Sequence, residues 1–126
     1  MLSSIPKQMT FEMVRKIGLA LPDVEESTTF GATSLKARGK LLTCPALNKS
    51  AESGSIMVRV GFDQRQALLE DAPDIYYVTD HYASYPAVLV RLSRIDVAAM
   101  QGLLRMSWQF VTAKKPARKG NARRIP

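Results

Sequence analysis

A short apolar run directly after a proline, Ala87 to Leu92, constrains the fold more than any other stretch of this sequence. Pro86 has no backbone N–H and would interrupt a helix, so the run is typical of a largely buried β-strand. The preceding segment, Asp74 to Tyr85, contains all four tyrosines and the only histidine of the chain. We therefore expect the domain to be organised around this strand and the aromatic loop that leads into it.

Two helices are predicted near the ends of the domain. Thr10 is a suitable N-cap for a helix that runs to about Ala20, because apolar residues recur there at three- or four-residue spacing. Asp96 is a suitable N-cap for a second helix, whose apolar face runs from Val97 to Val111. Between the first helix and the first strand we expect an acidic turn over residues 23–27.

The middle of the chain predicts a shorter helix and the remaining strands. Asp63 followed by Gln66 is a capping box for a helix that ends near Asp71. Alternating or continuous apolar runs predict further strands, the first two forming a hairpin around Arg38-Gly39. The predicted strands cover residues 33–37, 40–47, 56–60 and 75–79.

This order predicts a single α+β domain of the type α-β(3)-α-β(2)-α, with an antiparallel sheet and helices packed mainly on one face. We assign residues 1–8 to a flexible lead-in, 9–113 to the domain and 114–126 to a basic flexible tail. One cysteine cannot form an internal disulfide, and no run has the length of a membrane span. We therefore expect a cytoplasmic protein. One His and one Cys cannot complete a zinc site without two carboxylates, and no Gly-rich phosphate loop follows a strand, so we expect no metal and no cofactor.

The positive charge is concentrated at the C-terminal end. Residues 1–96 contain eleven Lys and Arg and all eleven acids, so the net charge of +7 arises entirely after Asp96. Such an asymmetry favours a polyanionic partner, with nucleic acid (DNA or another polyanion) first and an anionic membrane surface second. The same residues would also serve as a solvated tail that keeps a neutral domain soluble. The six cations of this tail are Lys114, Lys115, Arg118, Lys119, Arg123 and Arg124.

A second group of cations lies at the predicted hairpin. Lys36, Arg38 and Lys40 would lie close together near its tip, with Arg59 on a neighbouring strand. They are secondary candidates for phosphate contacts that would extend the basic tail into a nucleic-acid surface. The alternative is an exposed sheet edge, where lysines prevent aggregation.

The aromatic loop is a candidate ligand site. Tyr82 and Tyr85 would stack on exposed bases while His81 or Arg91 contacts a phosphate. The alternative is that the tyrosines are half-buried core residues and that the histidine makes a local hydrogen bond.

Catalysis has little support in the sequence. Cys44 and His81 would form a nucleophile and a base, but Cys44 lies in an apolar strand where the thiol is not activated. Asp23, Glu25 and Glu26 are interpreted as turn and solvent residues rather than metal ligands. We therefore expect no catalytic residues and a protein that is not an enzyme.

Several landmarks, spread over residues 9–119, resemble the MmcQ/YjbR family of small bacterial proteins. They are the segment Leu21 to Ser27, the segment Lys36 to Lys40, Val58-Arg59-Val60, His81 and Ser107. The resemblance implies an α-β(3)-α-β(2)-α fold similar in shape to secretion chaperones and frataxin. Members are commonly described as DNA-binding. Many have an aromatic residue where this chain has Ala87, so a ligand role at that position does not carry over.

Two functions remain open from the sequence. The first is a nucleic-acid-binding protein that contacts mainly phosphates. The second is a protein-interaction or chaperone-like module that binds a peptide or small ligand at the sheet or at the loop from His81 to Tyr85. Such a module could also be a homodimer.

Overall fold

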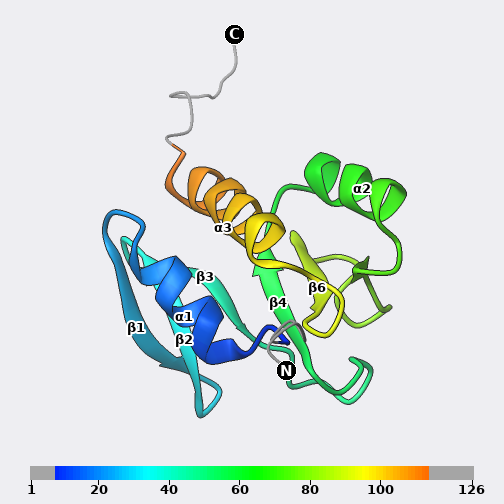
Figure 1. Cartoon of the computed structure of the whole chain (residues 1–126), viewed down its shortest axis with the longest axis horizontal. Helices are drawn as coiled ribbons and strands as arrows, with labels where there is room; N and C mark the ends of the chain where they lie inside the picture. The colour runs from blue at the N-terminus through cyan, green and yellow to red at the C-terminus, as the bar shows by residue number, and fades with distance from the viewer. Residues whose placement is uncertain (1–7, 114–126) are drawn as a thin grey trace, which may run out of the picture.

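A computed structural model describes residues 8–113 and shows an α+β domain with three helices and six strands in this range (Figure 1). The fold class expected from the sequence is confirmed. In chain order the elements are α1 (Phe11–Leu19), β1 (Val24–Thr29), β2 (Ala32–Ala37), β3 (Lys40–Pro45), β4 (Ser55–Arg59), α2 (Phe62–Asp71), β5 (Tyr76–Tyr77), β6 (Ala87–Arg91) and α3 (Val97–Thr112).

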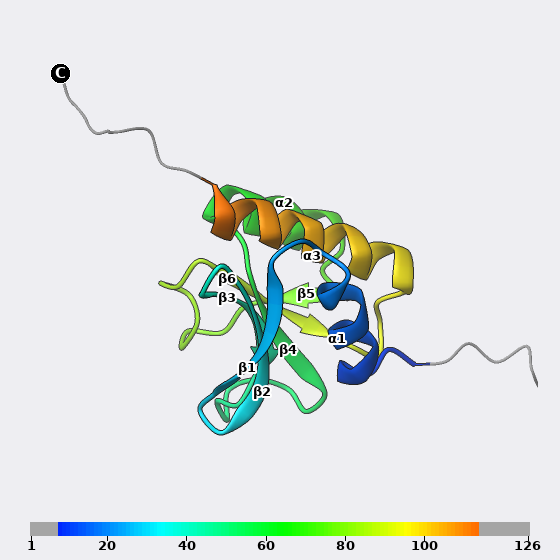
Figure 2. The ribbon, with the colours of Figure 1, turned by 90° about the vertical axis from the view of Figure 1, so that its left-hand side faces the viewer.

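All six strands form one antiparallel sheet in the order β1-β2-β3-β4-β6-β5. The expected strand over 87–92 lies next to β4 and is buried along most of its length. The three helices gather on one side of this sheet, with α3 across its middle (Figure 2). Among the described helices, none has the length and hydropathy that crossing a membrane requires.

Local capping explains where the helices begin. The Thr10 side chain accepts a hydrogen bond from the Met13 amide, and the Asp96 side chain accepts one from the Ala99 amide, as expected. The expected capping box at Asp63 is wrong, because α2 begins two residues earlier. Its N-cap is Gly61, whose amide donates to Oε1 of Gln64 at 2.9 Å.

The acidic turn expected over residues 23–27 is also wrong. Only Asp23 lies at a turn, with a positive φ of 61°, and Val24 begins the edge strand β1, which pairs with β2 along its whole length. An edge strand buries little surface, so it tolerates polar residues that hide the apolar alternation of a strand. Glu26 lies on the helix side and pairs with Arg15, whereas Glu25 lies on the opposite side.

A β-bulge in β3 decides which side chains reach each face of the sheet. Leu35 is paired with Thr43, but its neighbour Lys36 is paired with Leu41, so Leu42 is an extra residue. Leu42 and Thr43 are consequently both fully buried. Leu41 and Cys44 fall together on the opposite face of the sheet.

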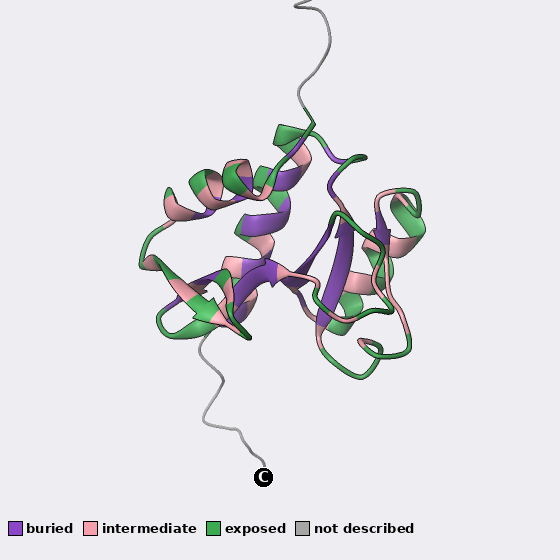
Figure 3. Cartoon of the chain, turned by 90° about the horizontal axis from the view of Figure 1, so that it is seen from below, coloured by how far each residue is buried: buried purple, intermediate pink, exposed green. Residues whose placement is uncertain are grey.

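The core lies between the sheet and the helices, and the buried residues run along the central strands and the inner face of α3 (Figure 3). A Cβ at Gly18 would overlap the Leu35 side chain, so this glycine lets α1 approach β2 closely. The buried Ser107 hydroxyl on α3 donates to the Leu42 carbonyl oxygen at the bulge. The buried Ser107 hydroxyl and the Leu42 carbonyl group thus satisfy each other, and their hydrogen bond stabilises the bulge.

Candidate ligand-binding site

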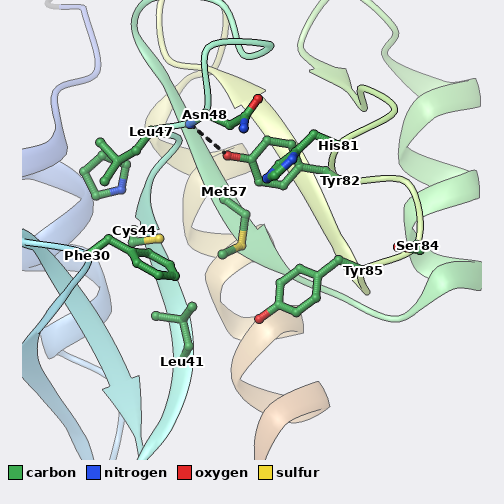
Figure 4. Close-up of a pocket in the computed structure, with 11 residues that line it drawn as sticks. Phe30, Leu41, Cys44, Leu47, Asn48, Met57, His81, Tyr82, Ser84 and Tyr85 are labelled. Carbon is green, nitrogen blue, oxygen red and sulfur yellow. Dashed lines mark hydrogen bonds between the residues drawn. The ribbon is translucent and has the colours of Figure 1, made fainter.

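The opposite face of the sheet is covered by loops instead of helices. Its buried cluster consists of Cys44, Met57, Ala87 and Leu89, and the residues packed against it come from loops and strands only. The loops before β4 and β6 cover this face incompletely and leave a pocket of about 670 Å³ (Figure 4). It is lined by Phe30, Leu41, Cys44, Pro45, Leu47, Asn48, Met57, His81, Tyr82, Ser84 and Tyr85.

The rim of this pocket concentrates exposed apolar side chains. Within residues 8–113 five large hydrophobic side chains are exposed, and three of them line the pocket. Phe30 is 89% exposed, Leu47 is 54% exposed and Tyr85 is 38% exposed. A cluster of exposed apolar groups around a concave surface is typical of a binding site.

The two loops that form the walls are joined by tyrosine hydroxyls. The Tyr82 hydroxyl accepts a hydrogen bond from the Asn48 amide at 3.4 Å, which is drawn in Figure 4. The Tyr77 hydroxyl accepts from the Glu52 amide at 2.7 Å and bonds the Ser55 hydroxyl at 2.7 Å. The Tyr82 bond joins the loop before β4 to the loop before β6, and the Tyr77 bonds fix the loop before β4 against β5, so the pocket walls are preformed.

Arg65 on α2 holds the aromatic loop from outside. Nη1 of its guanidinium lies within hydrogen-bonding distance of the carbonyl oxygens of Tyr82, Tyr85 and Ala87, and Nη2 donates to that of Ala83 at 2.9 Å. A planar, permanently charged fork is well suited to bind several carbonyl groups of one loop. One side chain therefore sets the course of the chain through the pocket wall.

Phe30 reaches the pocket from a tight turn between β1 and β2. Phe30 and Gly31 both have positive φ, 52° and 79°, and Thr29 is paired with Ala32, which defines a two-residue hairpin turn. Such turns normally contain Asn or Gly at the first position, because a bulky residue there is strained. In Figure 4 the Phe30 ring lies near Cys44 and Leu41, so the strained position presents an aromatic ring to the pocket.

Cys44 and His81 both line the pocket, but they are not arranged as a nucleophile and a base. Burial raises the pKa of the Cys44 thiol, so the thiol remains protonated at neutral pH. His81 is exposed and packs edge-on against Tyr82, with a centroid distance of 4.9 Å. No hydrogen bond joins the two side chains within residues 8–113.

The structure brings three of the four predicted loop residues together. His81, Tyr82 and Tyr85 line the pocket, whereas Arg91 lies at the far end of β6, outside the lining. Its guanidinium forms a bidentate ion pair with Glu52 at 2.8 Å and stacks on the Tyr77 ring. The structure therefore does not bring Arg91 to the pocket together with the other three residues, and its contacts hold the end of β6 against the loop before β4.

The predicted hairpin cations are separated. Arg38 pairs with Asp23 at 3.0 Å and lies over the Trp108 ring on α3. Lys36 lies on the pocket face, since its neighbour Leu35 packs against the helices, and Lys40 is exposed at the hairpin turn. The six tail cations Lys114, Lys115, Arg118, Lys119, Arg123 and Arg124 lie outside the described residues.

Sequence reasoning missed the residues that complete the pocket and hold it. Phe30, Leu47 and Met57 line it, and Arg65 fixes its wall. One signal was available for Phe30: a phenylalanine before glycine in a hairpin turn departs from the usual turn chemistry. No local pattern indicates Arg65, because its contacts are 17 to 22 residues away in the sequence.

A six-stranded antiparallel sheet covered by helices on one face and hollowed on the other defines a small α+β domain with a ligand-sized pocket. The chain belongs to the YjbR family, whose model matches residues 19–110. This confirms the resemblance found in the sequence.

Comparisons with individual proteins find uncharacterised relatives and a solved structure of the same fold. The chain is 41% identical over 49 residues to uncharacterised proteins of Mycobacterium tuberculosis (Rv2570) and Mycobacterium bovis (Mb2600). In each case the match spans 39% of this chain and 38% of the relative. The crystal structure of Deinococcus radiodurans protein DR2400, with a DUF419 domain, superposes with a TM-score of 0.68. That comparison has 18% identity and covers 85% of this chain and 81% of the other, so the fold is shared.

Proposed function

We propose that this protein is a binding module, not an enzyme, and that it takes a small, largely apolar ligand into the pocket on the helix-free face. One observation carries the proposal: three exposed apolar side chains, Phe30, Leu47 and Tyr85, surround a pocket with an apolar floor. Its volume of about 670 Å³ is that of small-molecule sites, which are generally apolar and largely preformed.

The energetic cost of this arrangement supports the proposal. Phe30 combines a strained backbone with a ring that is 89% exposed, and neither feature stabilises the folded protein. Strain and exposed apolar surface of this kind concentrate at functional sites. A single cysteine and the absence of a disulfide fit the reducing cytoplasm, where we place the protein.

The test is a fluorescence titration with N-phenylnaphthylamine, an uncharged aromatic probe that becomes bright in apolar surroundings. We expect saturable binding to the full chain, weakened several-fold by Leu47→Ser because the rim loses apolar contact. Val97→Ser is the matched control, since Val97 is 43% exposed but does not line this pocket. An absence of saturable binding, or equal loss in both variants, would contradict the proposal.

Nucleic-acid binding through phosphates is a second candidate, and the charge distribution favours it. The described residues 8–113 contain eleven cations and eleven acids and are therefore neutral, and all six tail cations lie outside this neutral part of the chain. Arg38 lies over the Trp108 ring in the last turns of α3, so one predicted hairpin cation lies near the C-terminal end of this helix. Contacts to phosphates need only positively charged side chains, and they give an affinity that depends on salt and not on the nucleotide sequence.

Binding of a labelled DNA duplex tests this candidate. The full chain is compared with a chain that ends at Ala113 and with one whose six tail cations are replaced by Gln, each at low and near-physiological salt. We expect both changes to weaken binding equally for unrelated sequences and to flatten the salt dependence. Binding that survives both changes would contradict a role for the tail.

A further inference from the structure

We propose that the pocket prefers ligands that carry one anionic group on an apolar body, and that Arg59 and Lys36 bind this group at the Leu41 end of the pocket. The inference rests on the proposed ligand-binding function and specifies its ligand class. It arises from two cations that the sheet register places beside a pocket residue.

The register puts these cations on either side of Leu41. Lys36 on β2 is the direct partner of Leu41 on β3. On the other side of β3, Thr43 is paired with Val58, so Arg59 is the β4 residue next along the strand toward Leu41. Side chains on one face of neighbouring strands lie close together, so the apolar Leu41 side chain in the pocket has a cation on each side.

The Arg59 guanidinium is held by neutral groups, so its contacts leave its positive charge uncompensated by a carboxylate. Its carbon atom lies 4.9 Å from the centroid of the Tyr85 ring and 5.5 Å from that of Phe110. Nε donates to the Pro86 carbonyl oxygen at 3.1 Å, and Nη1 donates to the Tyr85 hydroxyl at 3.4 Å. All these partners are neutral, and the four ion pairs found within residues 8–113 do not include Arg59.

Tyr85 connects this guanidinium to the pocket. Its ring forms one wall, and in Figure 4 its hydroxyl points toward the side where Leu41 lies. An anionic group near this hydroxyl would accept from both the phenol and Nη1 of Arg59. Arginine suits this role because charge-assisted hydrogen bonds are about twice as strong as neutral ones.

The acids on this part of the sheet offset at most one of the two cations. Glu25 is the direct partner of Lys36 on β1, but no ion pair forms between them among the described residues. The nearby Asp23 and Glu26 are paired with Arg38 and Arg15. With Glu25 counted against Lys36, the charge of Arg59 still leaves this end of the pocket positive.

The experiment uses two probes of the same apolar body, N-phenylnaphthylamine and its sulfonated counterpart anilinonaphthalene sulfonate. We expect the full chain to bind the sulfonate about tenfold more tightly. Arg59→Gln should remove this preference, and Lys36→Gln should reduce it about threefold. The preference is the ratio of the two affinities within each variant, so a loss that both probes share does not affect it, and circular dichroism shows that the variants are folded. Arg59→Lys keeps the charge but loses the fork, and we expect an intermediate result.

Arg105→Gln is the matched control, because Arg105 is an exposed cation of α3 on the other side of the sheet. Equal affinity for the two probes would overturn the anionic preference and leave the proposed function intact. A preference unchanged by Arg59→Gln and Lys36→Gln, or one lost equally in Arg105→Gln, would also overturn it. No binding of either probe would overturn the proposed function itself.

Discussion

The two faces of the sheet are built in opposite ways. On the helix-covered face, strands and helices both contribute fully buried side chains, such as Leu35, Val58 and Leu104. On this side Ser107 of α3 also binds the bulge in β3. The other face has a smaller buried cluster and an open pocket whose rim exposes Phe30 and other apolar side chains.

This difference indicates where stability and binding are located. Close packing against helices removes apolar surface from water, whereas an open apolar surface contributes little to folding and remains available to a ligand. The bulge in β3 serves both faces, because it buries Leu42 and Thr43 together and puts Leu41 and Cys44 in the pocket. Substitutions on the two faces should therefore separate stability from binding.

The largest effect is expected on the helix-covered face. Leu104→Ala should lower the free energy of unfolding by about 2–5 kcal/mol, because it leaves a cavity in a fully buried site. Leu47→Ala on the pocket rim should change it by less than about 0.5 kcal/mol. Urea denaturation of both variants measures this difference, and equal losses would contradict the separation of the two faces.

A smaller loss is expected where α2 holds the pocket wall. Arg65→Met should lower the free energy of unfolding by about 2–3 kcal/mol, because it removes charge-assisted hydrogen bonds to the aromatic loop. N-phenylnaphthylamine affinity should fall as well, since the wall loses its position. The control is Arg105→Met, an exposed arginine for which no hydrogen bond is found among the described residues. Chemical denaturation and probe titration test both, and unchanged probe binding in Arg65→Met would disprove the wall-holding role.

The hairpin residue should show opposite effects on stability and binding. Phe30→Asn should raise the free energy of unfolding by up to about 1 kcal/mol, because Asn suits the left-handed backbone of this turn. Probe affinity should fall several-fold, because the pocket loses an aromatic ring. Thermal denaturation and fluorescence titration report the two quantities. A variant that loses stability would show that the Phe30 ring supports the fold.

The smallest effect concerns the ion pair at the far end of β6. The hydrogen bond from Arg91 lowers the pKa of Glu52 from its ordinary value of 4.5, despite the opposing effect of desolvation. The stability from this exposed pair is therefore complete above the ordinary pKa and is lost as pH falls through the lowered pKa. Thermal melts across this acidic range give the melting temperature at each pH. As the pH falls, the melting temperature of Glu52→Gln should decline less steeply than that of the natural chain. Equal pH dependence of the two melting temperatures would contradict a contribution of the Glu52–Arg91 ion pair to stability.

The fold could be predicted from the sequence because its buried elements carry strong patterns. The apolar run from Ala87 and the capped helix after Asp96 are both found as expected. The strand β1 could not be predicted, since Val24 is its only apolar residue and its pairing partner is known only from the fold. The cap of α2 was misplaced because Gly61 offers no side-chain signal.

The candidate site could be predicted only in part. His81, Tyr82 and Tyr85 were recognised because they lie together in the sequence, whereas Leu41 and Met57 reach the pocket through strand pairing and a bulge. Whether a cation binds a ligand or supports the fold depends on distant partners. Arg91 is held by Glu52, which lies 39 residues away in the sequence.

The most direct test of the binding face uses methyl NMR of methionine-labelled protein during titration with N-phenylnaphthylamine. Met57 lines the pocket, whereas the fully buried Met100 lies in the core on the helix-covered face. We predict a large, saturable shift of the Met57 methyl signal, caused by the aromatic ring of the probe, and no shift for Met100. A titration that moves Met100 as much as Met57, or that moves neither signal, would contradict binding on the helix-free face.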